Sequence, residues 1–160
     1  MQLSLLDKYH LGNRAEFFVH HADVTKSDEA KEAVLDLLKR QKRTALVYDL
    51  PKWDPEARKK KSQKAKMEQN KLWRNQVKEI NHLWLQQMAK KDHGFVEKMT
   101  LFWHGHFACR TVDNPYLTLE MNNLLRENAL GNFRDLLFAV SQSASMIAYL
   151  HLRQNKKGHP

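Results

Sequence analysis

Two histidines separated by one residue, His104 and His106, are the side chains in this sequence best suited to chemistry. Two imidazoles at this spacing can chelate a divalent metal ion when both project to the same side of the chain. On an α-helix, however, positions two apart diverge by roughly 200°, so the two rings would face opposite directions. We therefore expect the pair to form a divalent-metal site by itself only if the segment is extended.

A helical wheel places the two histidines on different faces of the helix expected over residues 95–109. His106 falls on the apolar face and is expected to be a buried core histidine. His104 falls on the opposite face, which also carries Glu97 and Thr100, and so has the better case for a functional role. An exposed or interface histidine remains the commoner explanation for such a position.

No other set of side chains forms a recognised catalytic motif. The five glycines are scattered singly, so the sequence contains no glycine-rich phosphate loop, and no serine has the flanking glycines of a nucleophile elbow. The single cysteine, Cys109, excludes an internal disulfide. A Cys109–His106 catalytic pair is a weaker interpretation than a small buried thiol.

A basic segment carries the whole charge excess of the chain, which is +9. Residues 39–79 contain fourteen Lys and Arg against five Asp and Glu, and the remaining residues are balanced. A clustered positive field attracts polyanions such as nucleic acid or acidic lipid surfaces, although a solvated helix face that aids solubility is the more common explanation. The candidate polyanion-binding residues are Arg58, Lys59, Lys60, Lys61, Lys64 and Lys66.

The elements that must position these side chains are helices. Only five glycines and four prolines are present, too few for the tight turns of an all-β fold, and 42% hydrophobic residues suffice for a core. Asp54 and Asn114 each precede a proline and are predicted helix starts, Asn132 is a further predicted cap, and Gly12 is a predicted helix end. Helices are predicted over residues 3–11, from a cap at Thr25 or Ser27 to about Gln41, and over residues 54–91, 95–109, 114–130 and 132–147, the last with a kink or break at 141–143. Residues 44–48 are predicted to be an edge strand or an extended connector.

The longest predicted helix, residues 54–91, has two unlike halves. Residues 55–66 have almost no apolar stripe, so we expect this basic part to project into solvent or to fray. The second half carries one apolar face, formed by Trp73, Val77, Ile80, Trp84 and Met88. A stripe of this kind is typical of a core-facing helix rather than of a surface on which bases stack.

No run of about 18 apolar residues is present to span a bilayer. The first seven residues lack the basic start and the long apolar stretch of a signal peptide. We therefore expect a soluble chain, and its cellular location stays open.

Several stretches of the chain match the motifs of one protein family. Residues 97–107 read EKMTLFWHGHF and residues 125–137 read LRENALGNFRDLL, while residues 146–150 and, more weakly, residues 10–17 add two shorter matches. They resemble the EKMTLFWHxHF, LR..ALGNFR.LL, MLxYL and HLLNRATFG segments of the bacterial domain-of-unknown-function family 1800. The resemblance covers about half of the chain and implies no established activity, and members of the family often look exported.

The sequence departs from that family pattern at two places. Residues 143–146 read SASM where the family usually has Asp-Pro-Ala-Met, which removes an expected turn, and His151 stands where an aspartate is common. The acidic helix that follows in the family, NENxARELMELFTLG, would begin after Pro160. The resemblance therefore implies the amino-terminal part of a longer domain.

We expect an all-α, irregular multi-helix array, in which residues 1–160 form a single helical domain that is incomplete at its C-terminal end. The favoured function is a structural or interaction module, whose partner is another protein or the missing C-terminal part of the same domain. One alternative is a metal-assisted hydrolase, with His104 or His106 as a ligand of a divalent metal and acidic residues beyond residue 160 completing the site. The other is polyanion binding, to nucleic acid, through residues 39–78.

Overall fold

The computed structural model describes residues 2–17, 27–39, 41–90, 93–109, 113–154 and 158. These residues form eight α-helices and no strand, which confirms the predicted all-α multi-helix array. No helix among them is long and apolar enough to cross a membrane. The helices are α1 (Leu5–Ala15), α3 (Ala30–Lys39), α4 (Pro55–Lys60), α5 (Gln63–Met88), α6 (Gly94–His106), α7 (Pro115–Asn128), α8 (Phe133–Gln142) and α9 (Ala144–Tyr149), and a 3-10 turn follows at Leu152–Gln154.

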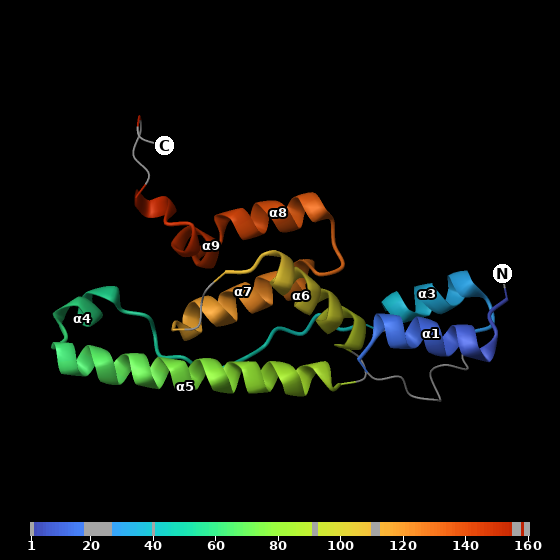
Figure 1. Cartoon of the computed structure of the whole chain (residues 1–160), viewed down its shortest axis with the longest axis horizontal. Coiled ribbons are helices and arrows are strands. Elements are labelled where there is room, and N and C mark those ends of the chain that lie inside the picture. The colour runs from blue at the N-terminus through green and yellow to red at the C-terminus, as the bar shows by residue number, and fades with distance from the viewer. Residues whose placement is uncertain are drawn as a thin grey trace.

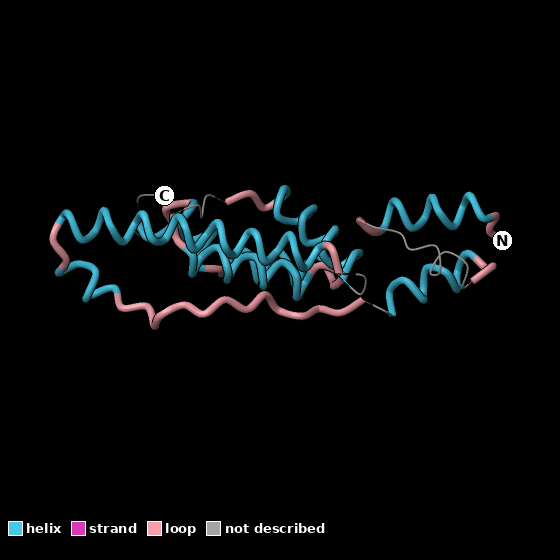
Figure 2. The backbone as a smooth tube through the Cα atoms, turned by 90° about the horizontal axis from the view of Figure 1, so that it is seen from below, coloured by secondary structure: helices cyan, strands magenta, loops and turns pink. Residues whose placement is uncertain are grey.

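Helix α7 lies at the centre of the array, where it contacts α5, α6, α8 and α9. The long helix α5 runs along one side of α6 and α7, while α8 and α9 cover the opposite side (Figure 1). Helices α1 and α3 lie at one end of the molecule, and α1 contacts α6 there. The turned view in Figure 2 shows the loop between α3 and α4 as a long extended segment that runs beside the helices.

Two clusters of buried apolar side chains lie on the two sides of α7. One fills the space between α7, α8 and α9, and it consists of Met121, Leu125, Leu136, Val140 and Met146. The other consists of Leu46, Ile80 and Trp84, so the extended loop contributes a leucine to the core. The predicted apolar stripe of α5 is confirmed for its first four members, which are all buried.

Side-chain caps fix the starts of α7, α8 and α9, the first two of them as predicted. Asn114 caps α7 ahead of Pro115, and Asn132 caps α8. Ser143 accepts a hydrogen bond from the backbone N–H of Met146 and caps α9. Each of these oxygens satisfies N–H groups that a helix start leaves without a partner. Of the predicted kink or break at residues 141–143, the structure has the break, which separates α8 from α9.

The prediction that the first helix ends at Gly12 is wrong, because α1 continues through this residue to Ala15. Its start is fixed by a capping box, in which Ser4 and Asp7 each accept a hydrogen bond from the other's backbone N–H. A glycine inside a helix costs only about 1 kcal/mol relative to alanine. That cost is too small to end a helix that is capped and docked against a neighbour.

The single helix predicted over residues 54–91 is two helices. Asp54 and Pro55 begin α4 as predicted, but Lys61 is extended, and the Ser62 hydroxyl accepts a hydrogen bond from the backbone N–H of Ala65 to begin α5. Serine favours a cap over a helix interior because its hydroxyl competes for backbone groups. Helix α4 therefore folds back along the start of α5 rather than extending it (Figure 1).

The two glycines of α6 have different surroundings. A Cβ atom at Gly94 would lie 3.0 Å from the Cβ and 3.1 Å from the Cγ of Glu16, whose side chain is buried beside it. A Cβ atom at Gly105 would meet no atom within 4 Å. Only Gly94 is therefore required by the packing of α6 against the end of α1.

We predict that alanine at these two positions changes stability in opposite directions. Gly105→Ala is expected to stabilise the protein by up to about 1 kcal/mol, because alanine has the higher helix propensity. Gly94→Ala is expected to destabilise it, because the new methyl group displaces Glu16. Urea unfolding of both variants measures the two effects. Equal stabilisation by the two substitutions would show that α1 does not dock closely on Gly94.

Candidate functional site

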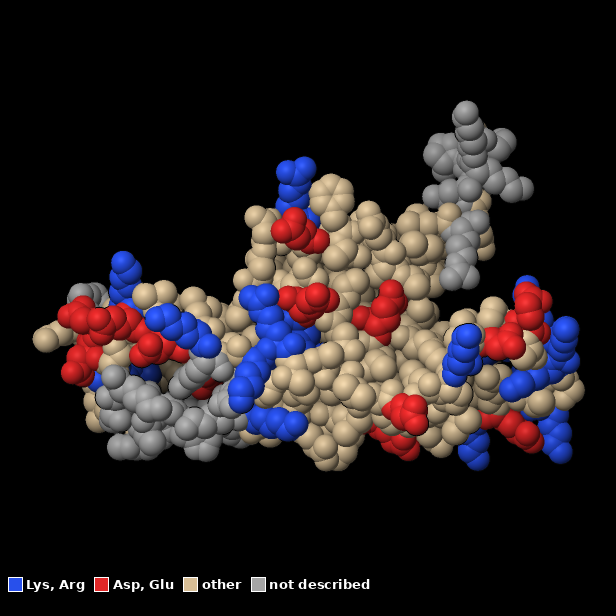
Figure 3. Space-filling view, turned by 180° about the vertical axis from the view of Figure 1, so that it is seen from behind, with Lys and Arg blue, Asp and Glu red and all other residues tan. Residues whose placement is uncertain are grey.

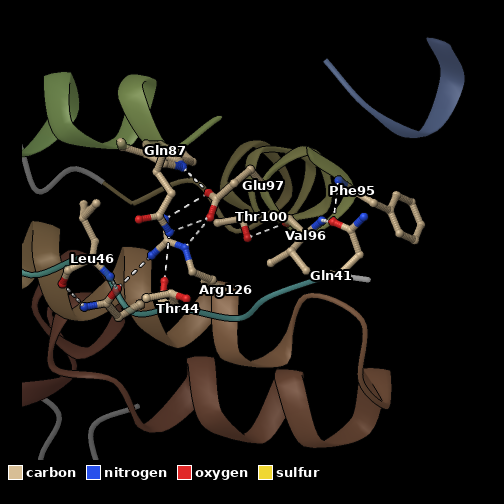
Figure 4. Close-up of polar contacts among 11 residues, drawn as sticks. Gln41, Thr44, Leu46, Gln87, Phe95, Val96, Glu97, Thr100 and Arg126 are labelled. Atoms are coloured by element: carbon tan, nitrogen blue, oxygen red, sulfur yellow. Dashed lines mark hydrogen bonds and ion pairs between the residues drawn. The ribbon is translucent and has the colours of Figure 1, made fainter. Parts of the chain in front are cut away.

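A fully buried ion pair joins α6 to α7. The side chains of Glu97 and Arg126 are 0% and 1% exposed. Arg126 donates from Nε to Oε1 of Glu97 at 2.6 Å and from Nη2 to Oε2 at 3.0 Å, as Figure 4 shows. This two-pronged geometry is the strongest arrangement between an arginine and a carboxylate.

Helix α5 completes the set of donors around the Glu97 carboxylate. Trp84 donates from Nε1 to Oε2 at 2.7 Å, and Gln87 donates from Nε2 to Oε1 at 2.9 Å. The same Gln87 nitrogen donates to the carbonyl oxygen of Thr44 at 2.8 Å. Each carboxylate oxygen thus accepts two hydrogen bonds, and the donors come from two helices. An unpaired carboxylate at this depth would cost several kcal/mol, so these four donors are the condition for its burial.

The remaining nitrogen of Arg126 extends the network to the loop that precedes α4. Arg126 Nη1 donates to Asn123 Oδ1 at 2.8 Å. Asn123 then binds the backbone of Leu46 twice, accepting from its N–H at 2.7 Å and donating to its carbonyl oxygen at 2.9 Å. The predicted edge strand or extended connector at residues 44–48 is an extended connector, held by side chains instead of by a neighbouring strand.

Gln41, at the beginning of the same loop, binds the start of α6. His93 gives α6 no side-chain cap. The Gln41 Oε1 atom takes that place, accepting from the backbone N–H of Phe95 at 2.9 Å and of Val96 at 3.3 Å. Its Nε2 atom donates to Glu16 Oε1 at 3.3 Å. Residues 41–46 therefore connect the end of α1 with α5, α6 and α7 through hydrogen bonds, and Figure 4 shows those to the last three helices.

The fully buried side of α6 is the one that carries Glu97 and Thr100, whereas the side predicted to face the core is only half-buried, at Phe95, Met99, Trp103 and Phe107. Val96, Glu97 and Thr100 are buried, and the Thr100 hydroxyl donates to the Val96 carbonyl oxygen at 2.8 Å. Phe102 is 56% exposed, and His106 is exposed as well. The prediction that His106 is a core histidine is therefore wrong. The ion pair, rather than the aromatic stripe, determines which side of α6 faces the core.

The two candidate metal ligands have different neighbours. The His104 ring lies 5.4 Å from the Trp84 ring, measured between centroids, and desolvation lowers the pKa of His104 below its ordinary value. The His106 ring lies instead among aromatic side chains, 4.9 Å from Phe107 and 5.9 Å from Trp103. The two imidazoles thus belong to different surroundings, as predicted for positions two apart on a helix.

The divalent-metal site at His104 and His106 stays a prediction. In the described part of the chain, no three His, Cys, Asp or Glu side chains gather where they could hold a metal ion. Glu97, the carboxylate nearest to His104 on the helical wheel, is committed to four hydrogen bonds. Further ligands would have to come from outside the described residues.

Cys109 has the environment of an unreactive thiol. It is half-buried, and desolvation raises its pKa, with the negative charge of Glu120 adding to the effect. Nucleophilic cysteines have a lowered pKa, because the thiolate is the reactive form. The surroundings of Cys109 therefore favour a packing role over the Cys109–His106 pair.

The basic residues predicted to bind polyanions lie on α4 and the start of α5, and they differ in their contacts. Arg58 turns inward, with its guanidinium carbon 4.2 Å from the centre of the Trp73 ring. Lys59 forms an exposed ion pair with Glu56 at 2.6 Å, and Lys61 donates to a glutamine side chain. Figure 3 shows basic and acidic side chains mingled at this end of the molecule. Lys59, Lys60, Lys61 and Lys64 are exposed, whereas Arg58 and Lys66 are only partly exposed.

The sequence interpretation missed the buried ion pair, although a signal for it was present. Arg126 directly follows Leu125 and lies one helical turn after Asn122, so it falls on the buried face of α7. A long charged residue on such a face requires a partner of opposite charge. Glu97 is the acidic residue of the motif stretch 97–107, and Arg126 belongs to the stretch 125–137, so the two main stretches of the family resemblance meet at this pair.

These features define a class of protein: an all-α array that is organised around a buried ion pair and has no recognised catalytic motif in its sequence. The chain belongs to the family described as "Protein of unknown function (DUF1800)", which it matches over residues 10–160. This match confirms the resemblance seen in the motif stretches. No curated protein and no solved structure matches the chain.

We predict that removing one partner of the ion pair destabilises the protein more than replacing both. Glu97→Gln leaves the buried charge of Arg126 without its counter-ion and is expected to cost about 3–5 kcal/mol. The double variant Glu97→Met/Arg126→Met is expected to cost less than the sum of its two single substitutions. Denaturant unfolding of the double-mutant cycle measures the coupling, and additive effects would show that none exists.

A matched control is the exposed ion pair between Arg74 and Asp113. Its two side chains are 64% and 53% exposed, and Arg74 Nε lies 2.8 Å from the aspartate oxygen. Asp113→Asn is expected to change the free energy of unfolding by only about 0–1 kcal/mol, because solvent screens the charges.

We predict that His104 makes stability fall as the pH falls. The folded state disfavours its imidazolium form, so the unfolded chain takes up more protons below the ordinary histidine pKa of about 6.5. The stabilising effect is therefore present above that pH and decreases below it. An NMR titration is expected to give His104 a pKa below 6.5, and His104→Gln is expected to lose less stability on acidification than the parent. A pKa at or above 6.5 would contradict the prediction.

Proposed function

We propose that this protein is a non-enzymatic helical module that binds an apolar helix on an exposed aromatic face. We define this aromatic face by Phe102, Trp103, His106 and Phe107 at the end of α6 and by Phe133 at the start of α8. The observation that supports the proposal most directly is the exposure of Phe102 and Phe133 on this face, while Trp103 and Phe107 are half-buried and pack against the cluster between α7, α8 and α9.

The rings of the aromatic face form one continuous surface across two helices. Phe102 and Trp103 lie 4.9 Å apart, measured between ring centroids, and Trp103 lies 5.7 Å from Phe133. Phe102 is 56% exposed and Phe133 is 49% exposed. Contiguous apolar surface of this kind is uncommon on a monomer and is typical of a protein interaction site. Large aromatic side chains also supply most of the binding free energy at such sites.

Helix α8 extends the same surface. Leu136 and Val140 face the core, while Leu137 and Phe138 are 45% and 55% exposed. A helix that is apolar on both its inner and its outer side is normally covered on both sides. The outer side of α8 therefore supports the proposal that a further helix lies there.

The contacts of the buried polar groups also favour a structural role over proton transfer. A general acid or base must reach a substrate atom within hydrogen-bond distance. Glu97 is fully buried, and both of its oxygens already have two donors each. The covering helix is supplied by a partner protein or by a further part of the same domain, and both sources require the same apolar contact.

The proposal predicts that the purified chain self-associates, because in isolation a second copy is the only apolar surface available to cover the aromatic face. Sedimentation equilibrium is expected to show a mass that rises with concentration. Phe102→Ser/Phe133→Ser is expected to weaken the association at least tenfold, since two exposed rings contribute about 1 kcal/mol or more each at an interface. Binding of an apolar dye is expected to fall in parallel.

The control for this experiment is Leu85→Ser, which removes an equally exposed side chain, 62% exposed, from α5 and outside the aromatic face. It is expected to leave both the mass and the dye binding unchanged. A parent chain that stays monomeric and binds no more dye than the double variant would reject the proposal.

A further inference from the structure

A pocket of about 540 Å³ lies between α4, the first half of α5 and the start of α7. Sites for small molecules commonly have volumes of about 300–1,000 Å³. The pocket is remote in sequence from the aromatic face, and its lining is both aromatic and basic. The lining residues that matter for its chemistry are Lys52, Trp53, Arg58, Lys61, Trp73 and Tyr116.

Three aromatic rings form one wall of the pocket. Trp53 comes from the extended loop, Trp73 from α5 and Tyr116 from α7, and their centroids lie 5.1 to 6.1 Å apart. The Tyr116 hydroxyl donates to the carbonyl oxygen of Pro51 at 2.6 Å, which fixes the loop that carries Trp53. Trp53 is 40% exposed, so part of its ring is open to a ligand. An exposed, fixed indole is a stacking surface for a planar ring.

Arg58 lies against the same wall with its hydrogen bonding incomplete. Its guanidinium packs on the Trp73 ring, and Nη2 donates to Asn70 Oδ1 at 3.1 Å. Its Nη1 atom and the Oε1 atom of Gln76, another lining residue, are shielded from solvent and have no hydrogen-bond partner among the described residues. Buried polar atoms without partners are rare in folded proteins. A ligand that carries both an acceptor and a donor would supply the two missing partners.

The charge around the pocket favours an anionic ligand. Its lining contains three basic residues, Lys52, Arg58 and Lys61, and two acidic ones, Asp54 and Glu68. The Asp54 carboxylate is already engaged in capping α4, where it accepts two backbone hydrogen bonds. Residues 58–66 contain six basic residues and no acidic one. The local field at the mouth of the pocket is therefore positive.

A cluster of two tryptophans and a tyrosine could in principle hold a quaternary ammonium group instead. Two observations argue against such a cation. The face of Trp73 is already covered by the guanidinium of Arg58. A cationic ligand would also be repelled by Lys52 and Lys61, which line the same pocket. A planar ring that carries a negative group fits both the aromatic wall and the field.

We propose that this pocket binds a nucleotide, with its base stacked on Trp53 and its phosphate beside Lys52 and Lys61. The edge of a base presents donors and acceptors together, which matches the unpaired atoms of Arg58 and Gln76. The nucleotide is either free or one unit of a single strand. The sequence predicted polyanion binding through the basic residues of segment 39–78, whereas in this proposal the aromatic pocket selects an unpaired base.

An NMR titration of the unmodified chain tests the position of the base. The protein has four tryptophans, so four indole N–H signals serve as reporters. On addition of thymidine monophosphate or of a fifteen-nucleotide oligothymidylate, the signals of Trp53 and Trp73 are expected to shift. The signals of Trp84 and Trp103, which lie outside the pocket, are expected to stay in place. Absence of shifts with both probes at low salt, or equal shifts of all four signals, would overturn the proposal.

Affinity measurements with labelled oligothymidylate separate stacking from charge. Trp53→Ala is expected to weaken binding about tenfold or more, and Trp53→Phe to restore most of it, because loss of a stacking ring is the cause. Lys61→Gln is expected to reduce the slope of log affinity against log salt concentration by about one, because one fewer counter-ion is released on binding. Lys59→Gln removes the same charge from the same segment but outside the pocket lining, and is expected to weaken binding less than about threefold.

Comparing the affinities for the monophosphate, the single strand and a duplex shows whether the nucleotide is free or part of a strand, and whether the pocket is the binding site. Tighter binding of the oligonucleotide than of the monophosphate indicates a single strand, and equal binding indicates a free nucleotide. Equal losses from Trp53→Ala and Lys59→Gln in folded variants, or binding of a fifteen-base-pair duplex as tight as that of the single strand, would show a diffuse charge effect and overturn the proposal.

Discussion

The buried ion pair between Glu97 and Arg126 is the constraint on which the rest of this structure depends. A carboxylate without access to water needs donors on all sides, and these come from α5 and α7. Satisfying them fixes the rotation of α6 about its own axis. Because side chains on a helix recur every 3.6 residues, placing Glu97 and Thr100 inside turns Phe102 outside. The exposed aromatic face is thus a geometric consequence of the ion pair.

The magnitudes of the competing free energies favour this arrangement of α6. Rotating the helix to bury Phe102, which is 56% exposed, would gain at most about 1.5–3 kcal/mol from the hydrophobic effect. The same rotation would carry Glu97 away and leave the guanidinium of Arg126, which is 1% exposed, without its counter-ion. Breaking a buried pair in this way costs about 3–5 kcal/mol. The pair therefore acts chiefly by making the alternative packing unfavourable, and the apolar surface that it leaves exposed is available to a partner.

The features that could be predicted from the sequence are those set by neighbouring residues. Asn114 with Pro115 and the apolar stripe of α5 involve groups within a few turns of one another, and both are present. The inner face of α6 could not be predicted in the same way. Helical periodicity assigns each side chain by its own polarity, whereas Glu97 is buried because of Arg126, which lies 29 positions away. The candidate pocket was missed for a similar reason, since the break at Ser62 brings Arg58 back onto Trp73.

The two proposed binding surfaces share α7 but depend on different local causes. Tyr116 at its start lines the pocket, whereas Arg126 near its end holds α6. The two residues are ten positions apart, which separates them by about 15 Å along the helix axis. The aromatic face requires the rotation of α6 that the ion pair imposes. The pocket requires that α4 folds back along α5. The Ser62 cap permits this turn, and the cation–π contact of Arg58 with Trp73 stabilises it. Since neither cause involves the side chains of the other, a partner on one surface and a ligand on the other can bind independently, and α7 serves as the rigid element that carries both.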